Sequence, residues 1–229
     1  MRHLALLVLA ITLLVPVSAQ AYCKLALAFA LDVSSSVNDG EYRIQLHGLA
    51  DALASDEVQD AILSPEGAHI MAAAYEWSGY PQQTLLLDWT KLDTPGAISL
   101  FANQLRQTRR RYAEFPTALG KAVEFGAHLL HRAPPCSRQV LDISGDGENN
   151  VGVGPEYFRR QGLLDGLVIN GLVIQGAFPD PAIYYKQHVI QGPNAFMALA
   201  RDFEDYPDVI LGKLLREIEG DLIIGRVVQ

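Results

Sequence analysis

The sequence predicts an α/β protein with a doubly wound, mostly parallel sheet of six strands and helices on both faces. Two observations lead to this fold class, and a third indicates the number of domains. Apolar runs that are continuous, and do not alternate with polar residues, indicate strands buried on both faces of a parallel sheet. These runs alternate along the chain with amphipathic segments of helical period. No Ser/Gly/Pro-rich linker and no tandem repeat divides the sequence, so we expect a single domain over residues 22–229.

Residues 1–21 have the pattern of a secretory signal peptide. Arg2 precedes an apolar stretch over residues 4–15, and Ala19, Gln20 and Ala21 form an A-x-A cleavage site. The apolar stretch is about a dozen residues long, whereas a helix needs roughly 20 to span a bilayer. We therefore expect the segment to be cleaved and the mature protein to be periplasmic or secreted, with no transmembrane segment.

The first half of the mature chain predicts a strand, a helix and a hairpin. The strand is expected over residues 25–31, which are apolar at every position. Asn38 and Glu41 form a capping box, after which apolar residues recur at helical spacing for about 15 residues. Two further strands, over residues 69–76 and 84–89, are joined by a turn too short for a parallel crossover, so they must form a hairpin.

The second half continues the alternation of helices and strands. Proline at the first helical position marks several of the helix starts. A loop over residues 144–150 is dense in turn formers and directly follows a strand. The expected elements are helices over residues 94–107, from Thr117, from Pro155 and over 207–220, with strands over 138–143, 167–174 and 195–200.

The composition suits a globular domain and excludes a nucleic-acid partner. The chain has 229 residues, of which 49% are hydrophobic and 19% charged, so it can bury a normal core. Its 18 basic residues against 26 acidic ones give a net charge of -8. A nucleic-acid-binding surface needs a clustered excess of Lys and Arg, and the one basic run, residues 109–111, is expected to be a solvated loop, with docking of an acidic partner as the alternative.

A group of oxygen-bearing side chains follows the first predicted strand. Asp32, Ser34 and Ser36 have the spacing D-x-S-x-S, so a tight loop can direct three oxygen atoms at one point. Such hard ligands suit Mg²⁺, Mn²⁺ or Ca²⁺, whereas zinc prefers His or Cys. Ser and Asp also serve as ordinary turn and cap residues after a strand, so the spacing alone does not establish a metal site.

Two more oxygen-bearing residues are expected at the same edge of the sheet. Thr117 stands at the start of a predicted helix, and Asp146 follows the fourth predicted strand. Open α/β sheets bind ligands outside the carboxyl ends of their strands, where the strand order reverses. If the first and fourth strands flank that reversal, Asp32 and Asp146 face each other across the crevice.

The two cysteines support the same neighbour relation. Cys23 and Cys136 are the only cysteines, and an exported chain lies where disulfides persist, so we expect them to pair. Cys23 is nine residues before Asp32, and Cys136 is ten before Asp146. A disulfide at the lower ends of two parallel neighbours would therefore bring their upper ends level to within one residue.

These residues resemble the metal-ion-dependent adhesion site (MIDAS) of von Willebrand factor A (VWA) domains. The matching residues are Asp32, Ser34, Ser36, Thr117 and the pair Asp146-Gly147, and the resemblance covers nearly the whole mature chain. More narrowly, the sequences ALDVSSSV and DISGDGENN look like an exported bacterial family of A-like proteins whose function is unassigned. The resemblance implies the strand order 3-2-1-4-5-6 with strand three antiparallel.

The resemblance also implies the role of each ligand. The hydroxyls of Ser34, Ser36 and Thr117 would coordinate the ion directly, and Asp32 and Asp146 directly or through water. A carboxylate of a protein or other partner would complete the coordination. The chain departs from the usual pattern at two places, because Gly145 stands where Thr or Ser commonly precedes the Asp-Gly pair, and residues 115–116 are Phe-Pro where glycines are commoner.

The function expected from this set is divalent-cation-dependent binding of a partner, without catalysis. Asn149, Asn150 and Trp77 are possible rim residues for that partner. One alternative is a metal-dependent phosphohydrolase with Asp32 as nucleophile, but such enzymes carry D-x-D, and Ser34 cannot act as a general acid at neutral pH. The other alternative is a metal-free interaction scaffold.

Overall fold

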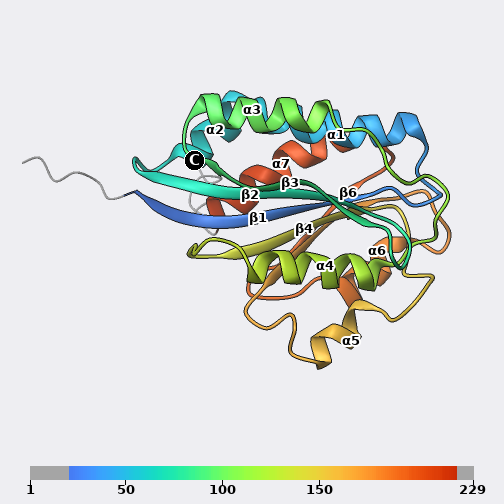
Figure 1. The fold of residues 1–229 in the computed structure, drawn as a ribbon. Coiled ribbons are helices and arrows are strands. Elements are labelled where there is room, and N and C mark those ends of the chain that lie inside the picture. The colour runs from blue at the N-terminus through green and yellow to red at the C-terminus, as the bar shows by residue number, and fades with distance from the viewer. Residues whose placement is uncertain (1–20, 221–229) are drawn as a thin grey trace, which may run out of the picture.

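The computed structural model describes residues 21–220 and contains one six-stranded sheet between two layers of helices (Figure 1). The strands are β1 (Tyr22–Asp32), β2 (Ala68–Trp77), β3 (Gln83–Leu92), β4 (Gln139–Gly145), β5 (Val168–Ile174) and β6 (Met197–Ala200). The helices are α1 (Asp39–Ala54), α2 (Asp56–Leu63), α3 (Pro95–Arg106), α4 (Leu119–His131), α5 (Pro155–Arg160), α6 (Pro181–Tyr184), the π-helix η1 (Tyr185–Val189) and α7 (Tyr206–Glu219).

The order of the strands in the sheet is β3-β2-β1-β4-β5-β6. β3 pairs antiparallel with β2, and the other neighbouring pairs are parallel. The predicted fold class, strand order and hairpin are therefore confirmed. The predicted signal peptide is not tested, because residues 1–20 lie outside the described part of the chain.

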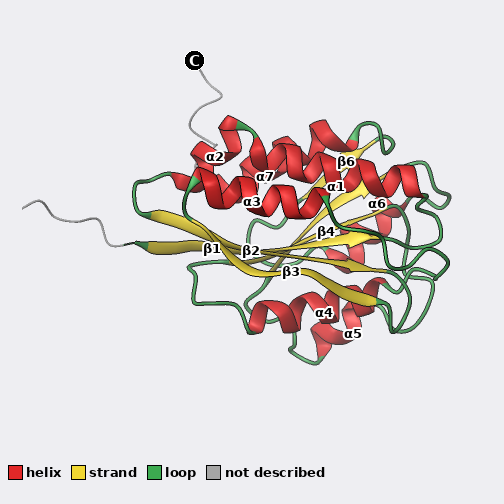
Figure 2. Cartoon of the chain, turned by 45° about the horizontal axis from the view of Figure 1, so that its top comes forward, coloured by secondary structure: helices red, strands yellow, loops and turns green. Residues whose placement is uncertain are grey.

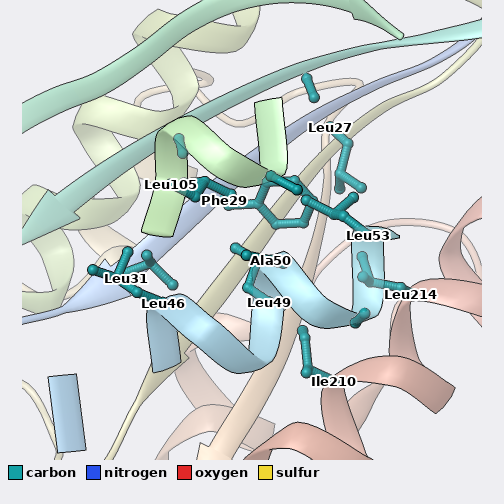
Figure 3. Close-up of a cluster of buried hydrophobic side chains, with 14 of the residues drawn as sticks. Leu27, Phe29, Leu31, Leu46, Leu49, Ala50, Leu53, Leu105, Ile210 and Leu214 are labelled. Carbon is teal, nitrogen blue, oxygen red and sulfur yellow. The ribbon is translucent and has the colours of Figure 1, made fainter. Parts of the chain in front are cut away.

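Helices α1, α2, α3 and α7 cover one face of the sheet, and α4, α5 and α6 cover the other (Figures 1 and 2). The central strand β1 sends alternate side chains to the two faces. Leu27, Phe29 and Leu31 pack against α1 and α7 (Figure 3), whereas the alanines between them face α4. These small residues let α4 lie close to the sheet, where a Cβ added at Gly126 would come within 2.7 Å of Leu141.

Local sequence signals explain most helix ends. The side chain of Asn38 accepts from the backbone N–H of Glu41, and the Glu41 carboxylate accepts from the N–H of Asn38, which completes the predicted capping box of α1. α7 ends at Glu219 and is followed by the cap residue Gly220, whose φ of 62° lies in the region that favours glycine. Helix α2, begun by the Ser55 cap, and the segment α6–η1 were not predicted.

The disulfide and the β1–β4 register together align the carboxyl ends of these two strands. Cys23 and Cys136 are bonded, with a Cα–Cα distance of 4.6 Å and a separation of 113 residues, which confirms the predicted pairing. Ala26 pairs with Gln139, which is the same separation. If the register is continued to the carboxyl ends of the strands, Asp32 lies level with the last residue of β4, one residue before Asp146. The cysteine spacing predicted this alignment.

A buried ionic cluster joins α7 to the middle of the sheet. The ammonium of Lys213 lies 2.5 Å from Oδ1 of Asp142 on β4 and 2.6 Å from Oε1 of Glu217 on α7. Asn170 on β5 donates to the same Glu217 oxygen at 2.8 Å. All of these side chains are buried, so the attachment of α7 depends on charges that are shielded from water.

In residues 21–220, no helix is long and apolar enough to cross a membrane.

Candidate metal centre

The loop after β1 is held in place by hydrogen bonds to its backbone. Oδ1 of Asp32 accepts from the N–H of Ser34 at 2.7 Å, which closes a tight turn directly at the end of the strand. The Gln45 amide donates to the Asp32 carbonyl, and the Arg110 guanidinium donates to the carbonyls of Val33 and Ser34 at 3.1 Å each. The backbone that carries the proposed ligands is therefore fixed from α1 and from the loop after α3.

The hydroxyls of this loop meet the loop after β4. Oγ of Ser34 lies 3.1 Å from Oγ of Ser36, and Ser36 in turn donates to Oδ1 of Asp146 at 2.7 Å. Ser36 and Asp146 are 110 residues apart in the sequence. The contact arises because parallel neighbours end at the same edge of the sheet.

Thr117 reaches the site from the segment before α4. Its N–H donates to Oδ1 of Asn150 at 2.9 Å, and the N–H of Asn150 donates to the Thr117 carbonyl at 2.9 Å. A Cβ added at Gly147 would lie 3.6 Å from Oγ1 of Thr117, so this hydroxyl faces the turn formed by Asp146 and Gly147. The structure thus brings all five predicted ligands to one edge of the sheet.

The five predicted ligands are buried on the side that faces the protein core and accessible on the side that faces solvent. Asp32 and Ser34 are fully buried and Thr117 is 5% exposed, whereas Ser36 is exposed and Asp146 is half-buried. An ion held by these oxygens would be accessible to an external ligand only from the side of Ser36 and Asp146.

The electrostatics of the site favour a cation. Burial raises the pKa of Asp32 to about 7, and repulsion from the Asp146 carboxylate adds to the shift. Burial also raises the pKa of Asp146, although the hydrogen bond from Ser36 opposes the shift. Oδ2 of Asp32 is buried and has no hydrogen-bond partner among the described residues. A positive charge between the two carboxylates would offset both the burial and the repulsion.

The donor set fits a hard divalent ion. Two carboxylates and three hydroxyls offer oxygen atoms alone, which is the chemistry of Mg²⁺, Mn²⁺ and Ca²⁺ sites. Within residues 21–220, no three His, Cys, Asp or Glu side chains gather as a metal-binding group. An ion bound here would therefore need the hydroxyls as ligands, because the two carboxylates alone would not supply enough oxygen atoms.

Of the three expected rim residues, Trp77 is buried, whereas Asn149 and Asn150 lie at the surface beside the start of α4. Trp77 is fully buried within the core under α4, so the expectation that it lines an exposed rim is wrong. β2 continues to this residue, which places its side chain inside the sheet layer and not in the hairpin turn. Oδ1 of Asn149 accepts from Gly120, as Asn150 does from Thr117, so both asparagines fasten the β4 loop to the start of α4.

Sequence reasoning missed two residues of the site. Arg110 belongs to a basic run expected to be solvated, yet its side chain is only 10% exposed and holds the β1 loop. Tyr185 is buried in η1, and its hydroxyl lies beside Gly145. No local signal identifies Tyr185, whereas the departure from Thr or Ser at Gly145 is a hint that another side chain fills this space.

A family model described as "Protein of unknown function (DUF1194)" matches residues 22–222. A search of the curated proteins finds no match.

Several solved structures share the fold at low sequence identity. Proximal thread matrix protein 1 from the mussel byssus aligns with a TM-score of 0.62 and 14% identity, over 87% of this chain and 48% of that one. A second structure of that protein, with a TM-score of 0.61, is described as having a zinc-occupied MIDAS motif. The von Willebrand factor type A protein from Catenulispora acidiphila aligns with a TM-score of 0.60 and 13% identity, over 88% and 43% of the two chains.

The pilus adhesin SpaC from Lactobacillus rhamnosus GG aligns with a TM-score of 0.63 and 12% identity, over 87% of this chain and 30% of that one. The chain therefore spans less than half the length of each of these proteins. At such identities the likeness shows the fold, which is that of VWA domains.

Proposed function

The chain belongs to the family described as "Protein of unknown function (DUF1194)", whose model covers residues 22–222, and from that premise we propose that it is a divalent-cation-dependent module that binds a partner through a carboxylate. Mg²⁺ is the proposed ion, with Mn²⁺ or Ca²⁺ as substitutes. The proposed ligands are Asp32, Ser34, Ser36, Thr117 and Asp146. Bound there, the ion would supply Lewis-acid attraction for an anionic oxygen of the partner.

One observation supports the proposal above the others. The hydrogen-bonded chain Ser34–Ser36–Asp146 joins two loops at the edge of the sheet and brings the Asp146 carboxylate close enough to the buried Asp32 carboxylate for the two to repel each other. Two carboxylates that share a partly buried site are stabilised when a cation lies between them. A turn alone does not explain this arrangement, because the Ser36 hydroxyl donates to a carboxylate of the other loop.

The charge of the site favours an anionic partner. The three hydroxyls are neutral, so two carboxylates at most balance a divalent ion, and the ion keeps affinity for a further carboxylate. The chain carries a net charge of -8, so long-range attraction would not guide an anionic partner to it. The contact would depend on the ion itself.

The fold neighbours support a binding role and add zinc to the ions that the site could hold. One of them is described with zinc in its MIDAS motif, and another is a pilus adhesin. Zn²⁺ therefore belongs in any comparison of ions. We propose no enzymatic activity, because position 34 carries a serine where a D-x-D phosphohydrolase has its general acid.

The disulfide favours an oxidising compartment, so we propose that residues 1–21 are a signal peptide and that the protein acts in the periplasm or outside the cell. Measuring the mass of the protein after export would test the cleavage.

The binding function can be tested with a simple carboxylate. We expect acetate to lower the water-proton relaxation enhancement of the Mn²⁺-loaded protein, because acetate would replace ion-bound water at the open position. Titration to about 100 mM, at constant ionic strength, allows for weak binding by a probe that makes one contact. Acetamide, which has the same shape and no charge, is the matched control. If acetate and acetamide act alike, the proposed carboxylate binding is wrong.

A further inference from the structure

Three buried polar side chains converge beside the proposed metal ligands. Oδ2 of Asp32, the hydroxyl of Tyr185 and Nε1 of Trp77 are each buried and have no hydrogen-bond partner among the described residues. All three residues are 0% exposed. Buried polar atoms are almost always hydrogen-bonded, so three such atoms in one place require a shared explanation.

The three side chains surround the last residue of β4. A Cβ added at Gly145 would lie 2.5 Å from the Tyr185 hydroxyl, 2.9 Å from Oδ2 of Asp32 and 3.2 Å from Cζ2 of the Trp77 indole ring. Any residue larger than glycine would therefore collide with them. The structure uses glycine at this position so that side chains from β1, β2 and η1 can approach the same point.

The chemistry of the three atoms is complementary. The Tyr185 hydroxyl and the Trp77 indole N–H are donors, and the Asp32 carboxylate oxygen is an acceptor. None of the three atoms makes a direct hydrogen bond with another, yet the Tyr185 hydroxyl and Oδ2 of Asp32 both lie within 3 Å of the position that a Cβ at Gly145 would take, and the Trp77 indole ring borders it. One water molecule can accept from both donors and donate to the carboxylate, which is the usual number of bonds for a buried water.

We propose that Tyr185 is a positioning residue of the metal site, whose hydroxyl, together with the Trp77 indole, holds Oδ2 of Asp32 through one buried water. The inference rests on the proposed metal-binding function. Oδ1 of Asp32 is already fixed by the Ser34 N–H, so a bond to Oδ2 sets the rotation of the carboxylate. Groups behind the direct ligands commonly orient them in this way, and changing one weakens metal binding by about 10- to 100-fold.

The position of Tyr185 in the fold agrees with this role. It is the first residue of the π-helix η1, in a segment that is inserted between β5 and β6 and packs against the core under α4. π-helical turns occur frequently at functional sites because the extra residue redirects a side chain. The hydroxyl thus reaches the site from an element that contributes none of the proposed ligands.

The test compares Tyr185→Phe with the wild-type protein and with Tyr75→Phe. Tyr75 is an equally buried tyrosine whose hydroxyl donates to the carbonyl of Ala122, away from the proposed ligands. We expect Tyr185→Phe to raise the Kd for Mn²⁺ about tenfold and Tyr75→Phe to leave it unchanged. Equal Mn²⁺ affinities for the wild type and Tyr185→Phe would overturn the positioning role, whereas a wild type that binds no Mn²⁺ would overturn the proposed function itself.

A second measurement does not depend on the folding of a variant. A crystal structure of the metal-free wild type at high resolution is expected to show one water within hydrogen-bond distance of Tyr185 Oη, Trp77 Nε1 and Asp32 Oδ2. Absence of density there would contradict the inference. Thermal unfolding of Tyr185→Phe without metal adds a third readout. If the Tyr185 hydroxyl holds the water, its removal lowers the Tm of the protein, whereas removal of a hydroxyl without any partner would raise the Tm.

Discussion

Replacing Cys23 and Cys136 by serine should lower the free energy of unfolding by about 4–5 kcal/mol. The disulfide joins residues 113 positions apart, and in the chain-entropy model a cross-link of this span strongly restricts the unfolded chain. The effect is large compared with the usual total stability of about 5–15 kcal/mol for a domain. We expect the double variant to have a much lower midpoint in guanidinium chloride than the oxidised wild type.

The matched control for this prediction is the wild type unfolded in the presence of a reductant, which should show a similar loss. The folded double variant should keep the β1–β4 register, because five residue pairs of the ladder remain. If the free energy of unfolding falls by less than about 1 kcal/mol in both experiments, the disulfide does not stabilise the protein by restricting the unfolded chain.

Replacing Lys213 by methionine should destabilise the protein by about 3–5 kcal/mol. The ammonium lies within 2.6 Å of carboxylate oxygens from Asp142 and Glu217, and these side chains are 1% and 2% exposed. Without the lysine, two carboxyl groups remain buried next to each other. The loss comes from uncompensated charge, since methionine retains most of the packing of the lysine stem.

The loss should depend on pH in a defined direction. Burial, with a further contribution from Asp142, raises the pKa of Glu217 from 4.5 to about 8, and Lys213 opposes this rise. The folded protein therefore keeps a proton that the unfolded chain releases, so the stability associated with this group falls as the pH increases from about 4.5 to 8. Removing Lys213 strengthens that trend, and we expect Lys213→Met to lose more stability at pH 8 than at pH 5.

Lys91→Met is the matched control, because Lys91 pairs with Asp93 at 2.9 Å but both side chains are largely exposed. Exposed pairs contribute about 0–1 kcal/mol. If denaturation curves show the same loss for both lysine variants, the buried cluster does not stabilise α7 as described.

The elements with strong local signals were predictable from the sequence. The continuous apolar run before Asp32 gave β1, and the Asn38 capping box gave the start of α1. The spacing of the two cysteines gave the neighbour relation of β1 and β4, because a disulfide and a parallel register both fix distances along the strands. In these cases the residues that form the sequence pattern are the same residues that make the stabilising contacts in the structure.

The missed features depend on tertiary contacts. Helix α2 follows α1 directly, and Ser55 is both the C-cap of α1 and the N-cap of α2. No loop separates the two helices, so the sequence shows no clear boundary between them. Trp77 stood next to a predicted turn, yet one more residue of β2 places it in the core. The role of Tyr185 arises only when the segment between β5 and β6 folds back onto Gly145, a contact that no spacing in the sequence encodes.

Direct measurement of Mn²⁺ binding tests the central claim that five oxygen-bearing side chains form one ion site. We expect the wild type to bind one ion per chain in calorimetry, and to gain about 2.7 kcal/mol of stability when the ion is present at 100 times its Kd. Asp146→Ala and Thr117→Val should abolish both effects, whereas Asp60→Ala, which removes an exposed carboxylate from α2, should preserve them. Equal Mn²⁺ binding by all four proteins, or none by the wild type, would contradict the assignment of the site.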